Sequence, residues 1–94
     1  MEIISHEVEK LWDPTGILEG DRYEFIIDIE VPEDDELYSE NGLYVKLIFA
    51  VDQNGERIAQ YQIFERGTNI YLDFELEEEE LKMISEYCSK HIEQ

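Results

Sequence analysis

Cysteine and histidine are the side chains of this sequence best suited to bind a metal ion, and they are few. Cys88 and His91 lie three residues apart, a spacing that places both on one face of a helix. A structural zinc site needs four ligands, and His6 is the only other candidate of this kind in the chain. We therefore predict a buried thiol at position 88, and no metal ion or other cofactor.

The carboxylates are abundant, but their spacing matches no motif of ion binding or catalysis. Asp52, Asn54 and Gly55 partly match an EF-hand loop, which also requires further acidic ligands and a distal glutamate. A tight turn explains the same residues better. The sequence has no Gly-x-Ser-x-Gly elbow, phosphate loop or dinucleotide fingerprint. We expect no enzymatic activity and assign no catalytic residue.

Acidic and aromatic residues remain as candidates for binding. Glu77–Glu80 precede a helical stripe, and negative charge at a helix N-terminus contributes about 0.3–1 kcal/mol per charge, so structure accounts for much of that run. No such argument applies to a second acidic group in a loop, where binding residues are often found. The candidate interaction surface comprises that loop and two aromatic residues: Glu33, Asp34, Asp35, Glu36, Tyr38 and Trp12. Packing in the core or at a sheet edge is the alternative for the aromatic residues.

Five strands and one helix must position these residues. Apolar and mostly acidic residues alternate at a period of two over 22–31, which predicts a strand with one wet face. Residues 43–52 carry apolar side chains on both sides, which is typical of a central strand. Further strands are predicted near 2–12, 56–65 and 69–74, and a helix near 77–92 with the apolar stripe Leu81, Ile84, Cys88 and Ile92. The polar segment 32–42 is predicted as a loop, with room for one helical turn.

Two turns are predicted from short motifs. Asp13-Pro14-Thr15-Gly16 has the residue placement of a type I turn. Asn54-Gly55 is a strong hairpin signal, because both residues tolerate the positive φ angles of a type I′ turn. If these two residues form the loop, Val51 lies opposite Ile58, Ile48 opposite Tyr61, and Val45 opposite Phe64.

Composition limits the class of protein and of partner. The chain of 94 residues is long enough for one domain, residues 1–94, and its 43% hydrophobic content predicts that it folds. With 25 acidic and 7 basic side chains the net charge is −18, so nucleic acids and anionic membranes are poor partners. No apolar run suits a membrane span or a signal peptide, and the single cysteine agrees with a reducing compartment. We expect a cytoplasmic protein.

Two stretches of the sequence are distinctive. Residues 13–25 contain Asp13-Pro14-Thr15-Gly16 and Gly20-Asp21-Arg22-Tyr23, and residues 36–44 read Glu-Leu-Tyr-Ser-Glu-Asn-Gly-Leu-Tyr. With the Glu-rich last helix, they resemble a small uncharacterised domain family of Bacillus-type bacteria. Some members of that family are labelled pullulanase. Enzymes of the pullulanase type are built on a (β/α)₈ barrel of about 250 residues, so the length of this chain argues against the label.

The expected fold is α+β, an antiparallel meander of five strands with one C-terminal helix packed on one face. Because one helix covers only one face, the other face is buried either by strong curling of the sheet or by a second copy of the chain. The expected function is a non-enzymatic protein–protein interaction module that binds a protein partner or itself as a homodimer. The alternatives are an acidic decoy that mimics nucleic acid and occupies a basic partner, and a small ligand-binding protein or hydrolase.

Overall fold

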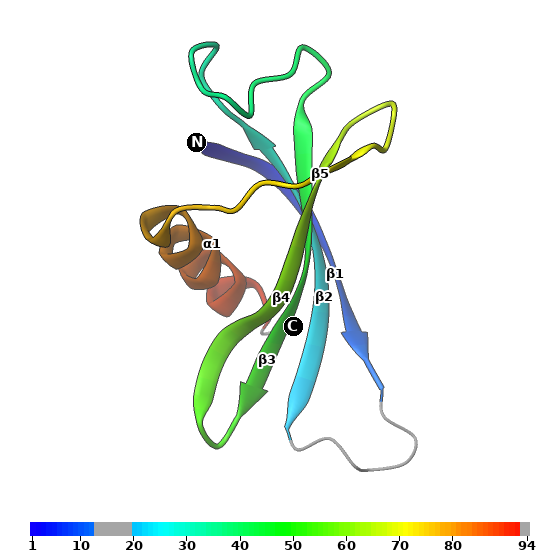
Figure 1. Ribbon diagram of the computed structural model, residues 1–94. Helices are drawn as coiled ribbons and strands as arrows, with labels where there is room; N and C mark the ends of the chain where they lie inside the picture. The colour runs from blue at the N-terminus through cyan, green and yellow to red at the C-terminus, as the bar shows by residue number, and fades with distance from the viewer. Residues whose placement is uncertain (13–19, 93–94) are drawn as a thin grey trace.

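The protein is an antiparallel sheet with a single helix against one face (Figure 1). The computed structural model describes residues 1–12 and 20–92. The elements are β1 (Glu2–Leu11), β2 (Asp21–Glu30), β3 (Leu43–Asp52), β4 (Gly55–Glu65), β5 (Tyr71–Leu72) and α1 (Glu78–His91). Each strand pairs antiparallel with the next one in the chain, and the sheet is not closed. This arrangement confirms the predicted α+β meander.

The core lies between α1 and the apolar face of the three central strands. On β2 the side chains of Phe25 and Ile27 are fully buried, while the alternating Glu24 and Ile26 point to the other face. Fully buried side chains of the different elements include Phe25, Ile27, Val45, Phe49, Ile63, Ile84 and Cys88. The predicted wet and apolar faces of β2 are therefore confirmed.

The sequence around α1 fixes where the helix begins and which face it buries. The Glu80 carboxylate accepts a hydrogen bond of 3.0 Å from the Glu77 backbone N–H, which satisfies one of the amide groups unpaired at a helix start. Leu76 and Leu81 pack against the core on either side of this first turn. Ile84 and Cys88 lie about one helical turn apart, and they are the buried residues of the predicted apolar stripe.

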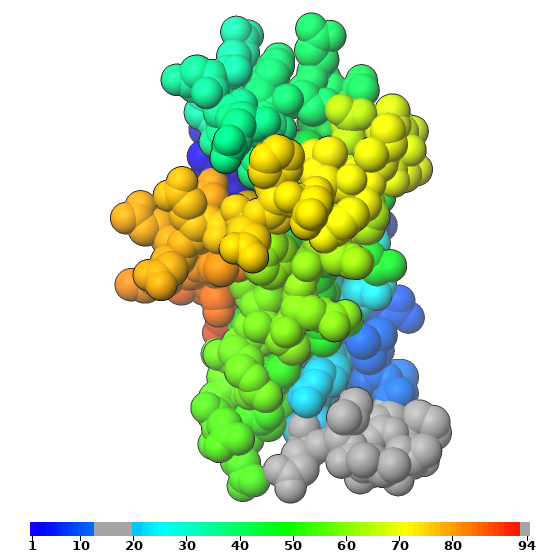
Figure 2. Space-filling view, viewed as in Figure 1, coloured from blue at the N-terminus to red at the C-terminus, as the bar shows by residue number. Residues whose placement is uncertain are grey.

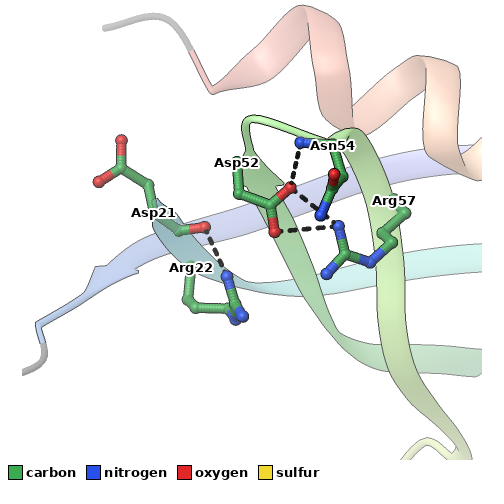
Figure 3. Close-up of polar contacts among 5 residues, drawn as sticks. All are labelled: Asp21, Arg22, Asp52, Asn54 and Arg57. Carbon is green, nitrogen blue, oxygen red and sulfur yellow. Dashed lines mark hydrogen bonds and ion pairs between the residues drawn. The ribbon is translucent and has the colours of Figure 1, made fainter. Parts of the chain in front are cut away.

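The predicted hairpin between β3 and β4 has the wrong turn and the wrong register. Asp52 pairs with Gly55, so Gln53 and Asn54 form the turn, and only Gly55 has a positive φ, of 112°. The Asp52 carboxylate accepts the Asn54 N–H at 2.9 Å and holds the turn in this position (Figure 3). The pairs are consequently Val51 with Glu56, Leu47 with Tyr61, and Val45 with Ile63.

Two β-bulges shift the register within the sheet. One leaves Ile4 without a partner on β2, and the other leaves Ala59 without a partner on β3. The first bulge turns Ile4 outward, where 60% of its surface is exposed, while Ile3 packs against the core. Bulges occur frequently on edge strands because they bend the strand and interrupt regular pairing.

The predicted strand 69–74 is shorter in the structure. β5 pairs only through Leu72 with Ile63 and Tyr71 with Phe64. A 2.9 Å hydrogen bond from the Phe74 N–H to the Leu72 carbonyl then turns the chain away from β4. Segment 32–42 forms consecutive turns, with hydrogen bonds from Asp35 to Pro32 and from Tyr38 to Asp35.

One face of the sheet, here called the open face, has no element of the described chain packed over it (Figure 1). It carries half-buried apolar residues such as Ile26 and Ile48 among charged ones. Of the two ways predicted to bury this face, closure of the sheet by strong curling does not occur.

The predicted turn at Asp13–Gly16 lies outside the described residues. Within the described ranges, no helix combines the length and the apolar character that crossing a membrane requires.

Candidate functional site

A groove on each flank of α1 follows from the widths of the two layers. Neighbouring strands lie about 4.8 Å apart, so the four long strands β1–β4 span about 14 Å without their side chains, whereas a helix with its side chains is about 10–12 Å wide. One helix therefore leaves part of the sheet uncovered on both sides. The groove toward β4 has a volume of about 650 Å³ and the groove toward β1 about 480 Å³.

The larger cavity, here called the α1–β4 groove, has three walls. β4 forms one wall, the first turns of α1 form the second, and the segment between β5 and α1 closes one end (Figure 2). The lining residues are Glu56, Arg57, Ile58, Ala59, Gln60, Tyr61, Tyr71, Asp73, Phe74, Glu75, Leu81, Lys82 and Ser85. The half-buried Ile58, Tyr61 and Leu81 also pack against the core, so the groove is continuous with it.

The segment from Asp73 to Glu77 is held in place above β4 by one side chain. The Tyr61 hydroxyl accepts a 3.0 Å hydrogen bond from the Leu76 N–H, and the Leu76 side chain is buried. This contact keeps the end wall of the groove at a fixed distance from β4. Two large aromatic side chains remain exposed at the rim, Tyr71 at 52% and Phe74 at 42%.

The charges at the α1–β4 groove are predominantly negative. Arg57 forms an ion pair of 3.1 Å with Asp52 across the hairpin, so that Asp52 compensates the Arg57 charge (Figure 3). The backbone hydrogen bond from Asn54 and the contact with Arg57 hold the pKa of Asp52 below its usual range. Lys82 is then the remaining cation of the lining, against three exposed acids, Glu56, Asp73 and Glu75. A cationic ligand would match this rim.

The opposite flank of α1 contains a cluster of His6, Tyr87 and His91, which joins β1 to the last turn of the helix. The Tyr87 hydroxyl and His6 Nδ1 share a hydrogen bond of 2.6 Å. The rings of Tyr87 and His91 are stacked 4.1 Å apart, and those of His6 and His91 meet edge to face at 4.5 Å. Desolvation, and then repulsion by His91, lower the pKa of His6 below its ordinary value of 6.5.

Cys88 lies one residue after Tyr87, but its thiol is buried in the core and does not take part in this cluster. The side chain is fully buried in the core beneath α1, which confirms the predicted buried thiol. Desolvation raises the pKa of Cys88 to about 12, so the thiol stays protonated and unreactive at neutral pH. Among residues 1–12 and 20–92, no three histidine, cysteine, aspartate or glutamate side chains are grouped so that they could hold a metal ion.

The predicted interaction residues are divided between the two ends of the molecule. Glu33, Asp34 and Glu36 are exposed and Asp35 is half-buried in the loop between β2 and β3, with Tyr38 41% exposed beside them. Trp12 follows the end of β1, next to Leu11, which pairs with Arg22 at the start of β2. It is therefore at the other end of the sheet from the acidic loop (Figure 1). Trp12 is 81% exposed, and its ring lies 4.9 Å from Lys10 Nζ.

An aromatic cluster on the open face was not predicted. Tyr44 stacks on Phe64 at 5.2 Å, and Phe64 meets Tyr71 edge to face at 5.9 Å. Arg66, in the turn after β4, lies 5.8 Å from the Tyr44 ring and pairs with Asp28 on β2. Through Tyr71 this cluster borders the α1–β4 groove.

Two signals in the sequence could have indicated the groove and the cluster. Phe64 and Tyr71 lie symmetrically about Arg66-Gly67-Thr68-Asn69, residues typical of a turn, as cross-strand partners do. Residues 58–64 carry no charge in a chain in which 34% of residues are charged. The contact between His6 and His91 had no such signal, because 84 residues separate them.

The fold and the groove define a class: a small α+β domain with an open antiparallel meander and one helix across it. The chain belongs to a family of unknown function, DUF6509, whose model matches residues 1–94. The family match agrees with the expected uncharacterised small domain. No curated protein and no solved structure matches the chain.

Proposed function

We propose that this protein is a non-enzymatic protein–protein interaction module that binds its partner through the α1–β4 groove and the aromatic rim of that groove. The observation that carries the proposal is the exposure of Tyr71 and Phe74 at the rim of the α1–β4 groove. Exposed aromatic residues at the rim of a groove with a partly apolar wall are typical of protein-binding sites, where they bury large areas at a low cost in side-chain entropy.

The charge supports a protein partner over a nucleic acid or a membrane. A net charge of −18 repels polyanions at long range and increases the rate of association with basic proteins. We further propose that the protein acts in the cytoplasm of a Bacillus-type bacterium, in line with the resemblance of residues 13–25 and 36–44. The protonated, buried thiol of Cys88 supports a role without nucleophilic catalysis.

Capture of partners from a lysate tests this proposal if it uses matched variants. The double variant Tyr71→Ser/Phe74→Ser removes the aromatic rim, and Ala59→Arg introduces a long charged side chain at an exposed position of the groove wall. Trp12→Ser is the control, because Trp12 is an exposed aromatic residue at the other end of the sheet. Thermal unfolding checks that each variant is folded.

We expect one partner to be retained by the wild type and by Trp12→Ser, and to be lost from both groove variants. A partner lost only from Trp12→Ser, or only when Glu33 and Asp34 are neutralised, would refute the groove as the binding surface. If the affinity of the complex instead falls steeply between low and physiological salt, and neither groove variant weakens it, the result would favour the acidic decoy. Turnover of a small molecule would favour the ligand-binding or hydrolase alternative.

A further inference from the structure

The outer edge of β4 is largely without a neighbouring strand. β4 extends over Gly55–Glu65, but β5 pairs only with Ile63 and Phe64. In the described chain, residues 56–62 therefore have a strand on one side only, at β3. The backbone N–H and C=O groups that point outward along such an edge are available to another strand.

The α1–β4 groove lies where a sixth strand would run. A strand added to β4 would lie about 4.8 Å from it, along the wall formed by residues 56–61. Its side chains would alternate between the two faces of the sheet, and those on the inner face would meet Leu81 and Ser85 of α1. A groove between a free strand edge and a helix is the geometry in which protein domains bind extended peptides by strand addition.

The composition of this edge differs from that of the opposite edge. β1 presents Glu2, Glu7, Glu9 and Lys10, charges of the kind that keep a sheet edge from pairing. Residues 58–64 of β4 have none. The bulge at Ala59 divides the free edge of β4 into two short segments, so backbone pairing alone is limited and side chains in the groove must add to the affinity.

The charged residues at the rim of the α1–β4 groove determine which charge a bound peptide segment must carry. Asp52 compensates Arg57, which leaves Glu56, Asp73 and Glu75 against Lys82. The inner wall contributes the apolar side chains of Ile58, Tyr61 and Leu81. A second copy of the chain would bring another net charge of −18 to the same place, which opposes self-association. The complementary occupant is an extended segment in which apolar and basic residues alternate.

We propose that β4 binds an extended, basic segment of another protein as an additional strand of the sheet, in the α1–β4 groove. This inference rests on the proposed function and names the class of partner and the mode of binding. The partner's apolar side chains pack against Ile58 and Leu81, and its basic side chains lie near Asp73 and Glu75.

The test uses a synthetic peptide of four Lys-Val repeats with blocked ends, titrated into the full-length, ¹⁵N-labelled chain at low salt. We expect shifts in the amide signals of residues 56–62 and slower hydrogen exchange at those of their backbone N–H groups that point away from β3, because an added strand protects them. A peptide of four Glu-Val repeats has the same strand-forming pattern with the opposite charge. We expect it to bind at least about tenfold more weakly.

Two variants with the same change in charge separate the groove from the overall charge of the molecule. We expect Asp73→Asn/Glu75→Gln to weaken binding of the Lys-Val peptide about three- to tenfold, and Glu33→Gln/Asp34→Asn to weaken it less than twofold, since the four acids are all exposed. Equal weakening by both variants, or peptide shifts confined to residues 33–38, would refute strand addition at β4.

The remaining outcomes separate this inference from the proposed function. If the Lys-Val peptide causes no shifts at β4 but a partner is still lost from the Tyr71→Ser/Phe74→Ser variant, strand addition is wrong and the interaction module stands. If the protein alone forms a dimer with protected amides at residues 56–62, the second copy is the occupant and the basic partner is wrong. If neither partner capture nor peptide binding depends on the groove, both proposals fail.

Discussion

In the His6–Tyr87–His91 cluster, the protonation state of His6 affects how well β1 packs against α1. His6 is the only histidine on β1 and faces α1, while His91 lies in the last turn of the helix. Protonation of both rings would place two positive charges in contact at the point where β1 meets α1. Desolvation of the His6 ring, and after it this repulsion by His91, lower the pKa of His6.

We predict that acidification destabilises the protein through His6. Because the folded-state pKa of His6 lies below its ordinary value of 6.5, the unfolded state binds a proton more readily. The stability from neutral His6 is thus fully present above pH 6.5 and is lost as pH falls through 6.5 and then through the folded pKa. Chemical denaturation of the wild type between pH 7.5 and 5.5 should show this loss, and His6→Gln should reduce it.

Titration of the histidine ring signals by NMR provides the control. In the wild type, His6 should titrate below 6.5, and in His91→Gln its pKa should move up toward 6.5 because one cause of the shift is removed. Asp52 and Glu65 have lowered pKa values and titrate at more acidic pH, so they do not contribute in this window. A pKa of His6 that is unaffected by His91→Gln would contradict the role of the ring contact.

Close packing at the ends of the strands depends on one glycine. Gly20 precedes β2 with a φ of 74°, and a Cβ atom built on it would lie 2.2 Å from the Val51 carbonyl oxygen at the end of β3. Gly67, in the turn between β4 and β5, also has a positive φ, of 82°, but no atom lies within 4 Å of such a Cβ. Both glycines have a positive φ, but only at Gly20 would a side chain also overlap with other atoms. Comparing substitutions at the two positions therefore distinguishes the cost of the backbone conformation from the cost of steric overlap.

We predict that Gly20→Ala lowers the free energy of unfolding by about 2–5 kcal/mol, the sum of the positive-φ cost and the displacement of backbone in contact. Gly67→Ala, the matched control, should cost only about 1–2 kcal/mol. Urea denaturation of the three proteins measures both values. Equal losses for the two variants would show that β2 and β3 can separate at this end without cost.

The elements themselves were predictable from the sequence, whereas several of their contacts were not. The period-two alternation of β2 and the 3.6-residue stripe of α1 arise from local geometry, and both were predicted correctly. The hairpin register was wrong because the Asp52 side chain holds a turn at Gln53 and Asn54, and because Ala59 bulges. Strand 69–74 was predicted too long because the turn at Phe74 has no signal of its own in the sequence.

The candidate site shows the same division. The sequence identified the exposed acidic loop, but not that Trp12 lies at the other end of the sheet. It identified Cys88 as a core residue, but not the groove beside it. A groove depends on how much of the sheet the helix leaves uncovered, which is decided by the widths of two layers and not by any local pattern.

The net charge acts on the molecule as a whole. With 25 acidic and 7 basic side chains, like charges repel one another in the compact state more than in the unfolded chain. Among the described residues, three ion pairs join neighbouring strands and a fourth joins Arg66, in the turn after β4, to Asp28; these four ion pairs remove only part of this repulsion. Dissolved salt screens the repulsion over about 8–10 Å at physiological ionic strength.

We predict that raising the NaCl concentration from about 10 mM to about 150 mM increases the thermal stability of the protein. If screening contributes about 1 kcal/mol, Tm rises by about 4–8 °C for a domain of this size. Calorimetry measures the change. The variant Glu33→Lys/Asp34→Lys, at two exposed positions, should have a higher Tm at low salt and a smaller response to salt. A Tm that falls with salt would show that the four ion pairs outweigh the repulsion.

The sequence by itself determined the order and type of the elements, the wet and apolar faces of β2, the burial of Cys88 and the sign of the molecular charge. These properties depend on residues close together in the chain or on composition. Only the tertiary structure decided the register of β4, the shortness of β5, the contact between His6 and His91, and the α1–β4 groove. They arise where distant segments meet, since bulges, turns and the unequal widths of helix and sheet set which atoms come together.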